Sequence, residues 1–256
     1  MARRLLVLSG GHPYEAEPFA ALLDALGGWE VDHRVHPDAE EAVAAGAAAG
    51  AGAILFYDMG GYHFADGQVE TRPPSPGYRA AIEGWFAAGG GAVAMHHALA
   101  GWADWPRWGE MLGGRFLYRP EKVRGAPRLD SGYRHDVPYE AEVLALGHPI
   151  AAGLPARFPL HDELYLAEVF ADVVTPLLRA DHAFVAANFH SAAHAVAGRM
   201  YSNEGWDHPP GSDLIAWETR VSTGRLVYLQ PGDGPEAYAS PRIRRLLANA
   251  LDYVSR

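Results

Sequence analysis

Short apolar segments alternate with amphipathic segments along the first hundred residues. The apolar runs Leu5–Leu8 and Ala53–Tyr57 are continuous, which is typical of strands buried on both faces of a parallel sheet. Between such runs the spacing is helical, with Phe19, Leu22 and Leu26 on one stripe. This alternation of strands and helices is typical of an open, parallel α/β sheet. The pattern predicts strands at 5–8, 31–35, 53–57 and 92–95, and helices at 15–26, 38–49 and 77–88.

The most informative segment is the glycine-led stretch Gly89–Ala98. Its apolar strand Ala92–Met95 is followed by an exit of the form small-x-His-x-small. This is the spacing of a nucleophile elbow, in which small neighbours permit a tight turn from strand into helix. The pattern predicts that His96 is exposed at the edge of the sheet, where an imidazole can bind a metal or transfer a proton. The alternative is a histidine packed within a loop.

The second half of the chain carries weaker patterns. Gly, Pro and Arg dominate from 115 to 138, which predicts an inserted region of loops and short strands over the carboxyl edge of the sheet. Long loops are predicted at 58–76 and 188–211. No repeat, heptad or linker divides the chain, so we expect a single domain over residues 1–256. Further strands are predicted at 140–146, 177–180, 184–187, 214–219 and 226–229, and further helices at 104–112 and 241–254.

Composition narrows the classes of function. The formal net charge is −10 and no basic stripe is present, which argues against a nucleic-acid partner. The chain has no cysteine, so thiol catalysis, thiolate metal sites and disulfides are excluded. The first apolar run is too short for a signal peptide, and no stretch approaches the roughly 20 apolar residues of a membrane span. From these features we expect a cytoplasmic protein with no membrane partner.

Five landmarks occur in a characteristic order. They are Gly89–Ala98, Trp105–Phe116, His148–Pro155, Asp162–Tyr165 and Thr223–Tyr228. With these landmarks in this order, the chain resembles the ThuA-like family, which is named for trehalose utilisation. The resemblance implies a flavodoxin-like three-layer α/β/α sandwich with a mostly parallel sheet, similar to class I glutamine amidotransferases, and an insertion after the elbow. It also implies a role in sugar catabolism, including chemistry on 3-keto-glycosides, and in some members a divalent metal.

The resemblance places His96 where an amidotransferase has its cysteine, so the absence of cysteine excludes glutaminase activity. Many family members carry Gly-His after the last strand, whereas this chain has Gly232-Asp233. A carboxylate there could replace the imidazole as metal ligand or base. Glu163 is preferred over Asp162 only because it belongs to the acidic motif of the family, and strand alternation leaves open which of the two points inward.

Ligands of open parallel sheets bind beyond the carboxyl ends of the strands. Segments that follow predicted strands should therefore meet there, with Glu163 approaching from the insertion. Imidazole and carboxylates suit Zn²⁺, Mn²⁺ or a similar ion, and we predict His96, Glu163 and Asp233 as metal ligands and catalytic residues. The alternative is that these groups only satisfy loop backbone atoms. The ligand-binding residues predicted at this edge are His12, Tyr62, His63, His97, Trp102 and Tyr165.

Our leading hypothesis is an enzyme acting on a sugar or keto-sugar glycoside, as a metal-assisted hydrolase, lyase or isomerase. The alternative is a non-catalytic module that binds a sugar or a partner on the same scaffold. The expected partner is a small carbohydrate, and a homodimer is the base-rate expectation. Two other patterns are disfavoured: the pair His190 and His194 lacks the glutamate of a zincin motif, and Asp130–Asp136 holds Ser, His and Asp within one glycine-containing loop.

Overall fold

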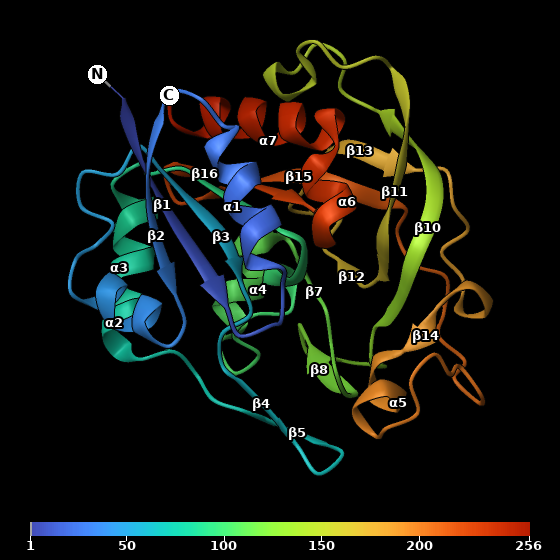
Figure 1. The fold of residues 1–256 in the computed structure, drawn as a ribbon. Helices are drawn as coiled ribbons and strands as arrows, with labels where there is room; N and C mark the ends of the chain where they lie inside the picture. The colour runs from blue at the N-terminus through green and yellow to red at the C-terminus, as the bar shows by residue number, and fades with distance from the viewer. Residues whose placement is uncertain (1) are drawn as a thin grey trace.

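The parallel half of the main sheet is built from five strands (Figure 1). A computed structural model describes residues 2–256. The strands pair in the order β16-β6-β3-β1-β2, and every pair among them is parallel. Continuous apolar runs fill the middle strands because both of their faces are covered. Their bounds are β1 (Arg3–Gly10), β2 (Trp29–Val35), β3 (Ala53–Asp58), β6 (Ala92–Met95) and β16 (Gly224–Leu229).

Helices cover both faces of this sheet and give three layers. Alternate residues of β1 enter different cores: Leu5 and Val7 pack in one apolar cluster, whereas Leu6 and Leu8 pack in the other. The first cluster includes residues of α1 (Ala16–Asp24), α6 (Gly234–Ala239) and α7 (Pro241–Val254). The second includes residues of α2 (Asp38–Ala44), α3 (Pro76–Ala87) and α4 (Pro106–Leu112). The α/β fold with a mostly parallel central sheet is thus confirmed.

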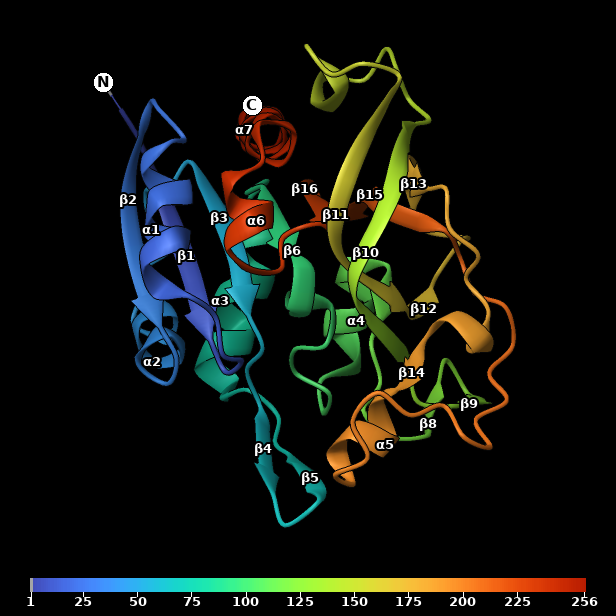
Figure 2. The same ribbon diagram turned by 45° about the vertical axis from the view of Figure 1, so that its right-hand side comes forward.

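An antiparallel extension continues the sheet beyond β16 (Figure 2). The order there is β11-β10-β13-β15, with each neighbouring pair antiparallel. This extension brings the long strands β10 and β11 beside the carboxyl end of β6. Its strands are β10 (Gly132–Val143), β11 (Arg157–Leu166), β13 (Thr175–Ala180) and β15 (Leu214–Val221), and the short β14 (His190–Ser191) pairs with β10.

Smaller elements surround the carboxyl edge. They are the hairpin β4 (Tyr62–Ala65) and β5 (Gln68–Thr71), the pair β7 (Gly114–Arg115) and β12 (Glu168–Val169), the hairpin β8 (Glu121–Val123) and β9 (Ala126–Arg128), the helix α5 (Ala192–Val196), and the 3-10 turns η1 (His96–Leu99), η2 (Pro149–Ala151) and η3 (Ala186–Asn188).

Five expectations from the sequence need correction. The helix expected at 38–49 ends at Ala44, and the loop expected at 58–76 contains the β4–β5 hairpin. The loop expected at 188–211 contains β14 and α5. The region expected to hold only short strands up to 138 contains the start of the twelve-residue β10. The strand expected at 184–187 is absent, since this described segment leads into η3. Among residues 2–256, no helix has both the length and the apolar character needed to cross a membrane.

Candidate functional site

The exit from β6 forms the tight turn that the sequence predicts. His96 has φ of 51°, a left-handed conformation that non-glycine residues seldom adopt. The turn continues directly into η1, with the small residues Ala94 and Ala98 on either side. However, the expectation that His96 is exposed is wrong, because its accessible surface is 0%. The reason is that side chains of β11 and of the segment after β16 cover the ring.

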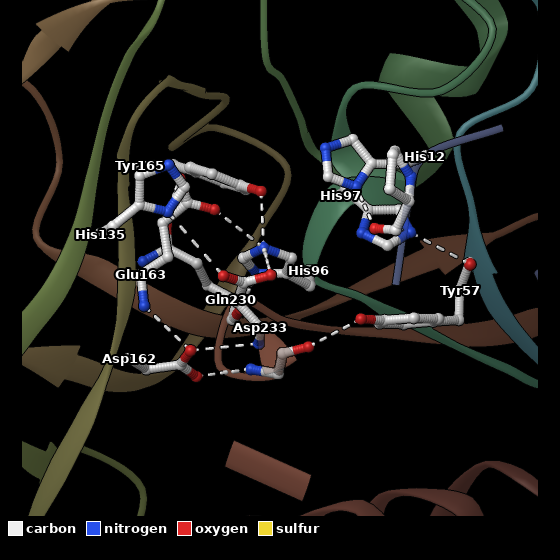
Figure 3. A network of polar contacts seen from close by, with 12 residues as sticks. His12, Tyr57, His96, His97, His135, Asp162, Glu163, Tyr165, Gln230 and Asp233 are labelled. Carbon is white, nitrogen blue, oxygen red and sulfur yellow. Dashed lines mark hydrogen bonds and ion pairs between the residues drawn. The ribbon is translucent and has the colours of Figure 1, made fainter. Parts of the chain in front are cut away.

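The His96 ring is held at both nitrogens (Figure 3). Its Nδ1 lies 2.9 Å from the backbone oxygen of Gln230, and because a carbonyl can only accept, Nδ1 donates. Its Nε2 lies 3.0 Å from Glu163 Oε2 and 2.7 Å from the hydroxyl of Tyr165. The hydroxyl of Tyr228 donates to the backbone oxygen of His96 at 2.9 Å. The orientation of the ring is therefore fixed, with Nε2 directed at the carboxylates.

Asp162 positions the segment that follows β16. Its carboxylate accepts hydrogen bonds from the backbone N–H of Gly232 at 2.6 Å, Asp233 at 3.1 Å and Glu163 at 2.9 Å. Burial raises the pKa of Asp162 to about 7, although its backbone hydrogen bonds and the charge of His96 act in the opposite direction. Both acidic residues of the Asp-Glu pair are thus buried, with different roles: Asp162 binds the backbone and Glu163 faces His96.

The three predicted ligands meet at one point. Asp233 Oδ1 lies 3.5 Å from His96 Nε2, and one donor atom each from His96, Glu163 and Asp233 lie within 4.8 Å of one another. Burial would lower the pKa of His96, but the hydrogen bond to Glu163 and the charge of Asp233 outweigh it and raise the pKa to about 9. Burial would raise the pKa of Asp233, but His135 and His96 lower it to about 2. Two carboxylates and an imidazole nitrogen therefore form a compact, anionic donor set.

His135 belongs to this site and was not among the predicted residues. Its Nδ1 lies 3.3 Å from Glu163 Oε1 and 3.9 Å from Asp233 Oδ2. The neighbouring carboxylate of Asp233 raises the pKa of His135 above its usual value. A register shift between Arg134 and Val137 breaks the strand alternation there, so periodicity could not indicate the direction of this side chain. The pairing of β10 with β11, the strand that carries Glu163, would have indicated that His135 lies near the site.

A small cavity opens above the donor set. It has a volume of about 150 Å³ and is lined by Glu163, Asp233, His135, Tyr165 and His12, among others. The rest of the wall is apolar or aromatic and consists of Phe116, Tyr118, Tyr133, Ala192, Ala195 and Met200. Glu163 and Asp233 therefore face a hollow, whereas His96 lies beneath them.

Several predicted ligand-binding residues lie outside this cavity. His97 is buried, and its Nε2 donates to the backbone oxygen of Tyr57 at 3.2 Å. Its ring stacks on that of His12, with 4.7 Å between the centroids. Trp102 is buried against Tyr78. His63 lines a separate hollow on the β4–β5 hairpin, and Tyr62 donates to the backbone oxygen of Ala100. The placements of Tyr62 and His63 follow from the hairpin, which the sequence did not reveal.

The two histidines of the disfavoured pair, His190 and His194, lie in different elements. His190 lies in β14 and is hydrogen-bonded to Arg134, whereas His194 lies in α5. Among the described residues, the cluster of His96, Glu163 and Asp233 is the one group of three such side chains close enough to hold an ion.

Comparison with known proteins gives a family and a set of related folds. The family model described as ThuA, trehalose utilisation, matches residues 4–254. No curated protein matches the chain. A ThuA-like protein of Parabacteroides merdae is 14% identical, with 100% of this chain and 90% of that chain covered and a TM-score of 0.69. A ThuA-like protein of Bacteroides uniformis is 20% identical, with 98% and 91% covered and a TM-score of 0.65.

A cytoplasmic protein of Salmonella typhimurium LT2 has the same architecture. It is 14% identical, with 99% of this chain and 100% of that chain covered and a TM-score of 0.60. At these identities the solved structures show a shared fold alone.

Proposed function

The chain belongs to the ThuA family, and we propose that it is an enzyme acting on a sugar or keto-sugar glycoside with the help of a divalent metal. The description of the family as trehalose utilisation suggests a carbohydrate-related role. The observation that carries the proposal is the convergence of His96, Glu163 and Asp233 at the floor of a cavity.

The donor set suits Zn²⁺ or Mn²⁺. A metal-binding histidine usually donates its other nitrogen to an oxygen, which fixes the ring and leaves a lone pair for the ion. The Gln230 carbonyl fills this role for His96, whose Nε2 faces the two carboxylates. Three protein ligands and a neighbouring cavity also match catalytic sites, which keep a position open. When bound, such an ion polarises a sugar carbonyl or lowers the pKa of a water molecule.

Two further groups of the chain are placed to hold and transfer protons. Tyr165 lines the cavity, and its hydroxyl lies 2.7 Å from His96 Nε2. The side chain of His135 is 40% exposed and lines the same cavity, beside Glu163 and Asp233. A titratable imidazole in this position suits general acid–base chemistry next to a keto group. We therefore assign His135 as the candidate proton carrier and Tyr165 as a candidate hydrogen-bond donor to a sugar oxygen.

A non-catalytic sugar-binding module is the second candidate. It is favoured by the complete burial of His96 and by the ion pair with Glu163, because a protonated His96 would satisfy the carboxylates as a structural contact. Glutaminase activity is not an option for either candidate, since the chain has no cysteine nucleophile.

The proposed function is tested by turnover of keto-sugars. Untagged protein is incubated with 3-keto-glucose, methyl 3-keto-glucoside and 3-keto-trehalose, in the presence of Mn²⁺, Zn²⁺ or EDTA. We expect turnover of a keto-glycoside only with metal, and a decrease of about 100-fold in Asp233→Asn. Glu218→Gln is the matched control, because Glu218 is a buried carboxylate 3.3 Å from His148 and outside the cluster. Sugar binding without metal-dependent turnover would instead support the binding module.

A further inference from the structure

A second and larger cavity adjoins the candidate site. Its volume is about 410 Å³, and its wall shares His12, Tyr118 and Ala195 with the smaller cavity. Because the same three residues line both cavities, the two cavities adjoin each other. They can therefore be treated as the inner and outer parts of one cleft, with the carboxylates at the inner end.

The sizes of the two parts limit what can bind. The inner cavity, at about 150 Å³, lies below the roughly 300 Å³ at which ligand pockets usually begin. The outer cavity alone exceeds that value. A ligand that fills the cleft is consequently larger than the group that reaches Glu163 and Asp233, and most of its volume lies in the outer cavity.

The wall of the outer cavity includes an aromatic surface on the β4–β5 hairpin. Phe64 remains 43% exposed, although it is a large apolar side chain. Its ring is stacked on Tyr62 at 5.6 Å with 6° between the planes, and it meets the edge of Tyr118 at 5.1 Å. The outer cavity thus offers one ring face held in place by two other aromatic residues. Rigid aromatic faces of this kind suit the flat, apolar side of a sugar ring.

Polar groups accompany this aromatic surface. His12, Asp66 and Gln68 line the same cavity and can form hydrogen bonds with hydroxyl groups. The polar groups are few beside an apolar wall, which is the usual composition of a small-molecule site.

The hairpin is held over the cavity at both of its ends. Arg119 donates to the backbone oxygen of Val69 and to the hydroxyl of Thr71, both at 3.1 Å. At the tip, a methyl group on Gly67 would lie 3.7 Å from the backbone oxygen of Val196, so the tip approaches α5 (Figure 2). Residues of both elements line the outer cavity. The hairpin and α5 therefore both form part of the wall of the same space.

We propose that the outer cavity binds the second ring of a disaccharide-sized glycoside, stacked on Phe64, while the first ring occupies the inner cavity. This inference rests on the proposed function, because it takes the inner ligand to be a sugar. It adds the place and the residue that select for a second ring, namely the outer cavity and the side chain of Phe64.

The test compares one-ring and two-ring ligands by calorimetry. Wild-type protein with Mn²⁺ is titrated with methyl 3-keto-glucoside and with 3-keto-trehalose. We expect tighter binding of the disaccharide, and Phe64→Ala should weaken that binding about fivefold while changing the affinity for the one-ring glycoside less than about twofold. Phe64→Tyr, which keeps the ring, should retain the affinity. Glu70→Ala is the control, because Glu70 is an exposed residue of the same hairpin that lines the separate hollow.

The possible results separate the two proposals. Equal affinity of the wild type for both ligands, or equal loss for both in Phe64→Ala, overturns the outer subsite and leaves the proposed function intact. Absence of binding by either glycoside overturns the proposed function and the subsite with it. Thermal unfolding of each variant shows whether Phe64→Ala is folded, and a loss of affinity in Phe64→Tyr as large as in Phe64→Ala also contradicts stacking.

Discussion

At the scale of single residues, the notable feature is the left-handed backbone of His96. An L-residue with a Cβ atom is strained in this conformation, by roughly 1–2 kcal/mol. Such outliers persist where the surrounding structure holds them, and they are frequent at functional sites. Here the hydrogen bonds to Gln230, Glu163 and Tyr228 hold the residue in place. The sequence indicated this turn through the small residues on either side of His96.

The strain at His96 predicts an unusual order of variant stability. His96→Gly and His96→Ala both remove the ring, but only glycine adopts a positive φ without cost. The glycine variant should therefore be more stable than the alanine variant, by about 1 kcal/mol in urea unfolding. At His33 in β2, which is not among the positive-φ residues, the same two substitutions should give the opposite order. An alanine variant of His96 as stable as the glycine variant would contradict the strain.

At the scale of elements, the site depends on β11 meeting the segment after β16. Asp162 makes this connection, because its two oxygens accept three backbone N–H groups. Its neighbour Glu163 meets His96 on the other side. Asp162 is thus a positioning residue, which sets the distance between Asp233 and the other two predicted ligands.

Asp162→Asn should therefore weaken metal binding without removing a ligand. An amide has one acceptor oxygen, and its NH₂ group would face a backbone N–H, so the segment with Asp233 should move. Losses of about 10- to 100-fold in affinity are usual for such supporting contacts. The measurement is the Kd for Mn²⁺ by calorimetry, with the exposed Asp181→Asn as control. An unchanged Kd in Asp162→Asn would show that Asp162 does not position Asp233.

A second contact between elements predicts a pH dependence of stability. Glu40 of α2 accepts from Arg72 at 2.7 Å and from the backbone N–H of Ser75 at 2.6 Å, beside the start of α3. Burial would raise the pKa of Glu40, but the hydrogen bonds with Arg72 and Ser75 outweigh it and lower the pKa. A lowered pKa gives stability that is present above the unfolded pKa of about 4.3 and is lost as the pH falls through the folded pKa.

Glu40→Gln should accordingly lower the free energy of unfolding by about 1–2 kcal/mol at pH 7. The difference from wild type should decrease as the pH falls below about 4. Urea unfolding measures this difference in the free energy of unfolding. Both proteins are unfolded at pH 7 and at the lowest pH at which they still fold. A difference that stays constant with pH would contradict a role for the Glu40 charge.

The parallel half of the fold could be predicted because its strands are buried on both faces and its helices have an apolar stripe. The antiparallel half could be predicted only in part: the strands expected at 177–180 and 214–219 match β13 and β15, whereas β11 and the first part of β10 were missed. The register shift in β10 interrupts its alternation, and an Asp-Glu pair lies inside the apolar strand β11. The same features explain the site: His96 follows a regular strand and was predicted, whereas His135 lies within the register shift of β10 and was missed. The pairing of strands distant in sequence is what brings Glu163 to His96.

At the scale of the whole molecule, the donor set lies between the carboxyl end of β6 and the long strands β10 and β11 of the antiparallel half. The parallel half provides His96 and Asp233, and the antiparallel half provides Glu163, Tyr165 and His135. The β4–β5 hairpin and α5 add the outer walls. Binding an ion between the two halves should stabilise the folded state by mass action, since the donors come together only on folding.

The central claim is that His96, Glu163 and Asp233 bind one divalent ion. The most direct measurement is titration of untagged, chelator-treated protein with Mn²⁺ and Zn²⁺ by calorimetry, alongside the Glu163→Gln and Glu218→Gln variants. We predict one ion per chain in the wild type and in Glu218→Gln, and an affinity at least about tenfold lower in Glu163→Gln. No binding by the wild type, or equal binding by Glu163→Gln, would contradict the account.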